Sequence, residues 1–224
     1  MSTGERMHAQ QEERYDGAYG PFVITDRDRR EVLGYRLALF TVAVSQAALL
    51  AQWHWLGTGR LWPWLLPMAA GLGLALRWIH IYLRPLHRAL QLFWLLGCLG
   101  LIALAVVAGP AAMASAAASD GRWIWAVGPF FAALAGIGFK EFFCFRRPEA
   151  IGVTLLLPIA LLGHLSGLLD APATGTLLAL EAALLLVLTL RKFPMPAAAD
   201  VGDKSVFEEL ERRRQGTGER GTDR

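Results

Sequence analysis

Residues 89–109 read ALQLFWLLGCLGLIALAVVAG, a stretch with no charged side chain and a single amide side chain, that of Gln91. At ~1.5 Å per residue, a helix of this length crosses a hydrocarbon core of roughly 30 Å. A helix on the surface of a soluble protein keeps one polar face, and this stretch has none. The stretch therefore predicts a transmembrane helix.

Other apolar blocks flank this stretch, and each is long enough to form a span. Nearly all charged side chains are confined to residues 1–36, to three short internal clusters and to the segment after Leu190, with the apolar blocks between them. The sequence therefore predicts an all-α fold, a polytopic transmembrane helical bundle of six spans. The predicted spans are residues 37–56, 61–76 with an extension to about 83, 89–109, 123–143, 150–170 and 174–190.

The orientation of the spans follows from the Lys and Arg residues near their ends, because positive residues are retained on the cytoplasmic side. One side carries twelve of them: Arg27, Arg29, Arg30, Arg36, Arg77, Arg84, Arg88, Lys140, Arg146, Arg147, Arg191 and Lys192. The other side carries two, Arg60 and Arg122. This alternation predicts that both termini lie in the cytoplasm.

The chain divides into three predicted segments. Residues 1–24 and 193–224 are mainly polar, which predicts mobile N-terminal and C-terminal tails. Residues 25–192 form the predicted six-span membrane domain. Thr25 and Asp28 have the spacing of a helix start, so we expect an interfacial lead-in helix that continues into the first span.

Two polar residues lie inside predicted spans, His164 in the fifth and Glu181 in the sixth. If these spans end at Asp170 and begin at Thr174, both residues lie roughly 9–11 Å inside the membrane boundary. A buried carboxylate is costly in lipid unless it is protonated or paired. We therefore expect a His164–Glu181 hydrogen bond, which would act as a structural clasp, as a proton carrier or as part of a substrate site.

Two charged clusters are predicted at the cytoplasmic surface. The first lies between the second and third spans and the second between the fourth and fifth. Glu141 is a natural counter-ion for Arg77 or Lys140, and the remaining positive charge would bind anionic lipid headgroups or a phosphate, or would only orient the spans. The residues of this inner-face set are Arg77, His80, Arg84, His87, Arg88, Lys140, Glu141, Arg146 and Arg147.

Motifs for catalysis and for cofactor binding are missing from the sequence. It has no His pair at i, i+4, no Cys-x-x-Cys, no phosphate loop and no Gly-x-Ser-x-Gly. His80 and His87 are seven residues apart, but Pro85 interrupts the helix that would align them on a metal or haem. The net charge of +3 and the lack of a nucleic-acid motif argue against nucleic acid. We expect no catalytic residue, no cofactor, no metal site and no nucleic-acid partner.

The strings HIYLRP at residues 80–85 and FKEFFCFR at residues 139–146 resemble those of an uncharacterised integral membrane protein family, found mainly in cyanobacteria and related plastid lineages. The resemblance covers roughly residues 20–195. It implies no particular activity. It does imply a bacterial cytoplasmic or thylakoid membrane and a role connected with photosynthetic complexes.

Two functional hypotheses remain open. The first is a non-catalytic assembly, scaffold or maintenance factor, favoured by small residues that recur at Ala69 and Gly73 and at Gly128, Ala132 and Gly136 and let helices approach closely. The second is a small-solute or proton-coupled transporter that uses His164 and Glu181. The expected partners are the lipid bilayer, subunits of a membrane complex and anionic lipid.

Overall fold

A computed structural model describes residues 14–57 and 59–219 of the chain. It contains two compact units. The larger unit, Gly34–Pro194, is the membrane bundle; the smaller, called the terminal unit, combines the described residues before Gly34 with those after Pro194. The helices of the bundle are α1 (Asp26–Leu56), which begins in the terminal unit, α2 (Trp62–Trp78), α3 (Arg84–Ala108), α4 (Met113–Ser119), the 3₁₀ helix η1 (Gly121–Trp123), α5 (Ile124–Phe145), α6 (Pro148–Leu165) and α7 (Ala171–Lys192).

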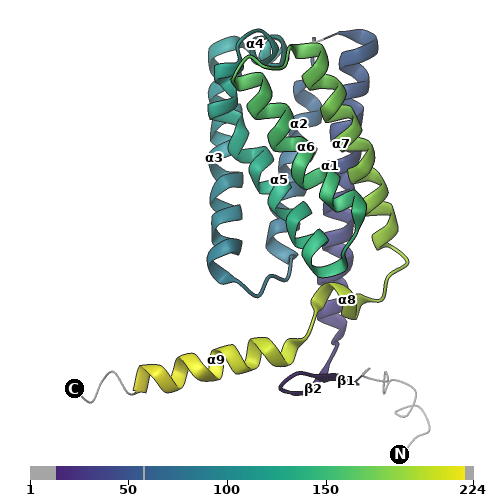
Figure 1. Cartoon of the computed structure of the whole chain (residues 1–224), viewed down its shortest axis with the longest axis vertical. Coiled ribbons are helices and arrows are strands. Elements are labelled where there is room, and N and C mark those ends of the chain that lie inside the picture. The colour runs from purple at the N-terminus through teal and green to yellow at the C-terminus, as the bar shows by residue number, and fades with distance from the viewer. Residues whose placement is uncertain (1–13, 58, 220–224) are drawn as a thin grey trace, which may run out of the picture. The chain divides into compact units, whose positions relative to one another are not determined.

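The long helices of the bundle run side by side, and the short helix α4 lies across one end (Figure 1). We call this the α4 end. Five helical stretches are long and apolar enough to cross a membrane: α1, α3, α6, α7 and the continuous stretch Gly121–Phe145 that contains α5. The all-α class and the polytopic membrane architecture are thereby supported, apart from a small hairpin in the terminal unit.

Helix α2 is shorter than the sequence predicted. It has 17 residues and ends at Trp78, because the backbone of Ile79 is extended. At ~1.5 Å per residue it covers about 26 Å, less than a hydrocarbon core of roughly 30 Å. The chain resumes a helix at Arg84, with Pro85 in the first turn, where the missing N–H of proline costs no hydrogen bond.

Glycines allow α3 to pack closely against α5. A Cβ added to Gly97 would collide with the backbone of Phe130, and one added to Gly100 would collide with the carbonyl of Ala126. Such close contacts increase van der Waals packing between the helices. In lipid this packing stabilises the bundle, because the hydrophobic effect does not drive helices together there. The sequence analysis did not identify this pair of glycines.

The small-residue face predicted on α2 packs against α3. The indole of Trp94 lies over Gly73, and its Nε1 donates a hydrogen bond of 2.9 Å to the carbonyl of Ala69. On α5, Gly136 faces the side chain of Leu90. Gly73 and Gly136 therefore admit side chains of α3. The rest of the predicted α5 face does not, because Ala132 is exposed and a Cβ added to Gly128 would meet only Ile124 of the same helix.

The terminal unit is built from both ends of the chain. Strands β1 (Arg14–Gly17) and β2 (Gly20–Val23) form an antiparallel hairpin, followed after the bundle by α8 (Ala197–Val201) and α9 (Lys204–Glu219). The Asp203 carboxylate accepts the N–H of Ala18 at 2.6 Å. Lys204 Nζ lies 2.8 Å from the carboxylate of Asp28.

These elements lie within residues 1–24 and 193–224, whose mobility stays a prediction. Each segment is too polar to fold alone, but together they bury Ile24, Val32 and Val201. The residues before 14 and after 219 lie outside the described residues. The predicted helix start is confirmed: Thr25 Oγ1 accepts the Asp28 N–H at 3.2 Å, and Asp28 Oδ2 accepts the Thr25 N–H at 2.8 Å. The predicted lead-in helix is the first part of α1.

Candidate functional site

Glu181 of α7 is completely buried in the bundle. Its carboxylate Oε2 accepts a hydrogen bond from the side-chain amide of Gln46, which lies on α1 and is 3% exposed. The glutamine amide therefore replaces one of the water molecules that would solvate a carboxylate. It is neutral and supplies no opposite charge.

This lack of a counter-charge distinguishes Glu181 from the other buried glutamates of the described bundle. Glu149 lies 3.0 Å from Arg191 Nη1, and Glu141 lies within 3.3 Å of two lysine ammonium groups. Only Gln46 is described as a partner of Glu181. A charged carboxylate in that position costs several kcal/mol unless a proton or a cation neutralises it.

Three buried side-chain oxygens of the bundle lack a hydrogen-bond partner among the described residues: Glu181 Oε1, Gln46 Oε1 and Thr174 Oγ1. Thr174 lies on α7 seven residues before Glu181, so both side chains leave nearly the same face of the helix. Each unpaired buried polar group costs about 1–3 kcal/mol. A purely structural clasp would pair these atoms, whereas a binding site leaves them for a ligand.

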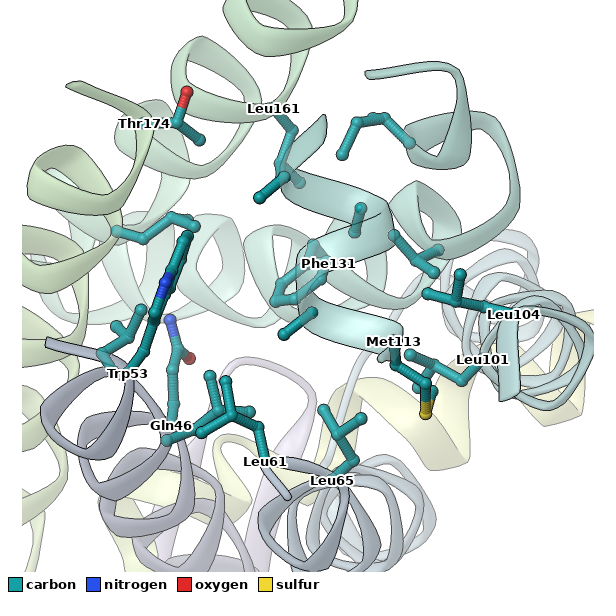
Figure 2. A pocket seen from close by; sticks show the side chains of 18 of the residues that line it. Gln46, Trp53, Leu61, Leu65, Leu101, Leu104, Met113, Phe131, Leu161 and Thr174 are labelled. Atoms are coloured by element: carbon teal, nitrogen blue, oxygen red, sulfur yellow. The ribbon is translucent and has the colours of Figure 1, made fainter. Parts of the chain in front are cut away.

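An apolar cavity of about 150 Å³ lies at the α4 end of the bundle, and Gln46 and Thr174 are among its lining residues. Figure 2 shows Gln46, Trp53 and Thr174 along one side of this cavity. Side chains such as Phe131, Leu161 and Met113 make the rest of the wall apolar. Gln46 thus lines the cavity and also holds Glu181.

The predicted hydrogen bond between His164 and Glu181 is not made. His164 Nε2 lies 3.0 Å from the carbonyl oxygen of Ala117, and Nδ1 lies 3.3 Å from that of Leu169. The prediction was wrong because α6 ends at Leu165 and not near Asp170. His164 therefore lies at the helix end, whereas Glu181 lies ten residues, about 15 Å, from the start of α7.

His164 still lines the cavity, but it lies closer to the α4 end of the bundle than Glu181 does. Its bond to Ala117 connects α6 to α4, the helix that covers this end of the bundle. Sequence reasoning missed Gln46 and Thr174. Their signal was weak, because each is one of several polar residues in its predicted span: Ser45 and Gln52 share the span of Gln46, and Thr176 shares that of Thr174.

A second buried polar cluster lies at the end of the bundle opposite to α4. Glu141 of α5 is fully buried, and its carboxylate lies 2.6 Å from Lys192 Nζ and 3.3 Å from Lys140 Nζ. The hydroxyl of Tyr35 donates a hydrogen bond of 2.6 Å to the same carboxylate. The Phe145 ring lies 4.6 Å from Lys192 Nζ and 5.3 Å from Lys140 Nζ, so it contacts both cations.

The predicted counter-ions of Glu141 were Arg77 and Lys140, and in the structure Lys140 contacts it. The structure adds Lys192 and Tyr35, which the sequence did not connect with this site because they come from the last turn of α7 and the beginning of the bundle part of α1. With two lysines and one glutamate, the cluster has an excess of one positive charge.

The structure separates the predicted inner-face set into buried and exposed members. Lys140 and Glu141 are buried, whereas the other members lie at the end of α2, on the α2–α3 connection, at the start of α3 or after α5. His87 is turned toward the protein, with Nε2 2.6 Å from the carbonyl oxygen of Leu76. Binding of an anionic headgroup by this set stays a prediction. The exposed arginines are Arg77, Arg84, Arg88 and Arg146; His80, His87 and Arg147 are half-buried.

The apolar helices with buried polar side chains between them define a multi-pass integral membrane protein. Residues 74–209 match the family described as uncharacterized integral membrane protein (DUF2301), and the chain belongs to that family. The match begins in α2 and ends in α9, so it includes Glu141 with its two lysines, Thr174 and Glu181, but neither Tyr35 nor Gln46. No curated protein and no solved structure matches the chain.

Proposed function

We propose that this protein is a proton-coupled transporter of a small solute and that Glu181, with Gln46, is its intramembrane binding site. The observation that carries the proposal is the apolar cavity that reaches Gln46, the hydrogen-bond partner of a buried carboxylate without a counter-charge. This site replaces the His164–Glu181 pair that the sequence predicted.

The coupling follows from charge conservation. When the site is empty, a proton neutralises the carboxylate of Glu181, because an isolated charge at this depth is unstable. When a monovalent cation binds, the proton leaves to water and the net charge of the site is unchanged. Gln46 separates the cavity from Glu181, so a rotation of its side chain exposes the carboxylate to the solute.

The proposed topology has six spans and places both termini in the cytoplasm. The six spans are the five long helical stretches and the shorter α2, which is the second span along the chain. The distribution of Lys and Arg supports this topology. In this orientation the α4 end faces the outside, and the exposed arginines of the inner-face set meet the cytoplasmic leaflet and its anionic lipids. We propose a bacterial cytoplasmic or thylakoid membrane in a cyanobacterial or plastid lineage, as the resemblance of residues 80–85 and 139–146 implies.

A second candidate function is that of an assembly or scaffold factor for a membrane complex. The observation that favours it is the exposed apolar face of α3, the spanning helix with the smallest buried share. Lipid or the helix of a partner subunit would cover this face. Native purification that recovers stoichiometric subunits would favour this candidate. The exposed residues of the face are Leu92, Leu95, Leu99, Ile102 and Val106.

Transport is tested with the full-length protein in liposomes that contain a pH-sensitive dye. The probe is guanidinium, which is permanently charged, rich in N–H donors and unable to cross lipid by losing a proton. We expect saturable guanidinium flux with opposite proton movement. Glu181→Gln should lower the flux at least about tenfold, which is about 1.4 kcal/mol in the rate-limiting barrier.

The matched control is Glu208→Gln, the same change at an exposed position of α9. It should leave the flux unchanged. Flux no greater than in protein-free liposomes, or equal flux in wild type and Glu181→Gln, would contradict the proposed function.

A further inference from the structure

A second hollow, a groove of about 910 Å³, lies between α1 and α7 on the surface of the bundle. Its floor is made by small residues of both helices: Ala47 and Ala51 of α1, and Gly175 and Ala179 of α7. Both helices are among those that are apolar and long enough to span a membrane. In the proposed topology the groove therefore runs between two membrane-spanning helices.

The groove and the cavity share one wall. Leu50, Trp53, Ala118 and Ala171 line both of them. A Cβ added to Gly175 would lie 3.8 Å from Cζ3 of Trp53, so the indole lies over the glycine and fills the space between α1 and α7. Figure 2 shows the Trp53 ring next to Gln46 at the edge of the cavity. Rotation of this one side chain would join the groove to the cavity.

The unpaired oxygens at the cavity wall and behind it indicate what a ligand must carry. Gln46 Oε1 and the carboxylate oxygen Glu181 Oε1 accept hydrogen bonds, and Thr174 Oγ1 accepts one as well as donating. Both Gln46 and Thr174 are more than nine-tenths buried and line the cavity. With a carboxylate behind Gln46, this set favours a cationic group with N–H donors and disfavours an anion.

We propose that the ligand is a single-chain alkyl cation with N–H donors, and that it enters from the lipid bilayer through the groove between α1 and α7, past Trp53. The head group binds at Gln46 and Glu181, and the alkyl chain lies along the floor of small residues. The indole of Trp53 attracts the cation as it passes. This inference rests on the proposed function, because it assigns a substrate class and an access route to the same site.

The route is tested with two probes that share one head group, octylguanidinium and guanidinium. Octylguanidinium partitions into the bilayer, whereas guanidinium reaches the site from water. Binding of each is measured to the full-length protein in nanodiscs of zwitterionic lipid, and flux is measured in liposomes. Octanoate, which has the same chain length class and the opposite charge, serves as the comparison for head-group chemistry.

The variant that blocks the groove is Gly175→Phe, because its ring would occupy the place of the Trp53 indole at the lipid side. Its control is Gly59→Phe, at a glycine where an added Cβ would meet no atom within 4 Å. A second pair is Trp53→Ala, which opens the shared wall, and Trp125→Ala, at an indole that is 76% exposed and lines neither hollow.

We expect the rate of octylguanidinium binding to fall about tenfold in Gly175→Phe and to rise in Trp53→Ala, with guanidinium changed less than about twofold and both controls like wild type. Octanoate should not bind. If both probes respond equally to Gly175→Phe, or neither does, the lateral route is wrong. If octylguanidinium does not bind, or octanoate competes with it, the ligand class is wrong.

The inference and the proposed function fail in different ways. Groove-dependent binding of octylguanidinium without flux of either probe would leave the site and its route intact and would overturn transport. Guanidinium flux that depends on Glu181 but is insensitive to the groove would leave transport intact and overturn the lateral route.

Discussion

Glu141 is expected to contribute more to the stability of the bundle than either lysine that it contacts. The variant Glu141→Gln leaves Lys140 and Lys192, which are 7% and 2% exposed, without a negative charge between them. Removal of one partner from a buried ion pair costs about 3–5 kcal/mol. Because 1 kcal/mol shifts the melting temperature of a domain of this size by about 2–4 °C, the variant should melt about 10 °C lower.

The decisive comparison is with Lys192→Met. Lys192 makes the shorter contact with Glu141, 2.6 Å against 3.3 Å for Lys140. Its removal nevertheless leaves one glutamate with one lysine and the hydroxyl of Tyr35, so the charge stays balanced. We expect a loss of only about 1 kcal/mol.

The assay is thermal unfolding in a mild detergent, followed by the intrinsic fluorescence of the tryptophans, with Glu208→Gln as the control for the loss of one carboxylate. Charge balance predicts that Glu141→Gln is the least stable variant. An equal or larger loss for Lys192→Met would refute this reasoning, since contact distance and not net charge would then determine the stability.

Three further predictions concern other parts of the chain. Gln46→Leu should cost about 1–3 kcal/mol, because it removes the partner of Glu181, and the double variant with Glu181→Leu should recover most of that loss in the same unfolding assay. Gly100→Leu should lower the unfolding free energy by at least about 1–3 kcal/mol, because its side chain meets the α5 backbone. In the terminal unit, hydrogen bonds from Ser205 and a backbone N–H hold the pKa of Asp203 below its ordinary value of 3.8. This contribution is present above that value and is lost as the pH falls through the lower folded pKa. The hydrogen-exchange protection factors of the hairpin, which are corrected for the intrinsic exchange rate at each pH, should therefore fall at acid pH, and less so in Asp203→Asn.

Features that depend on composition and spacing along one helix could be predicted from the sequence. The apolar blocks gave the membrane class, and Thr25 with Asp28 gave the start of α1. Burial of Glu181 also followed from its position in an apolar block. Each of these properties is local, because lipid requires every helix to satisfy its own backbone and to present apolar side chains.

Features that depend on which helices are neighbours could not be predicted. Glu181 was assigned to His164 because α6 and α7 are joined by a short turn, but its partner is Gln46 of α1, which is distant in sequence. The ion pair between Lys192 and Glu141 likewise joins residues that are distant in sequence. A depth estimate also depends on helix ends, and the four residues between Leu165 and Asp170 were enough to move His164 out of reach.

Polar residues on the first span were the signal that could have corrected the assignment. Gln46 is a buried amide within the first predicted span, and a buried amide needs a partner at the same depth. The terminal unit offers the opposite lesson, because Ala18 and Asp203 belong to segments that are too polar and too short to fold alone. Their hydrogen bond joins residues 185 positions apart, and local composition does not report such a contact.

The measurement that tests the central claim most directly is proton release when guanidinium binds to the purified full-length protein in weakly buffered detergent solution. If a proton on Glu181 is exchanged for the cation, wild type should release about one proton per bound guanidinium, Glu181→Gln should release none, and Glu208→Gln should behave like wild type. Guanidinium binding without proton release, or equal release from wild type and Glu181→Gln, would contradict the assignment of Glu181 and Gln46 as the coupled binding site.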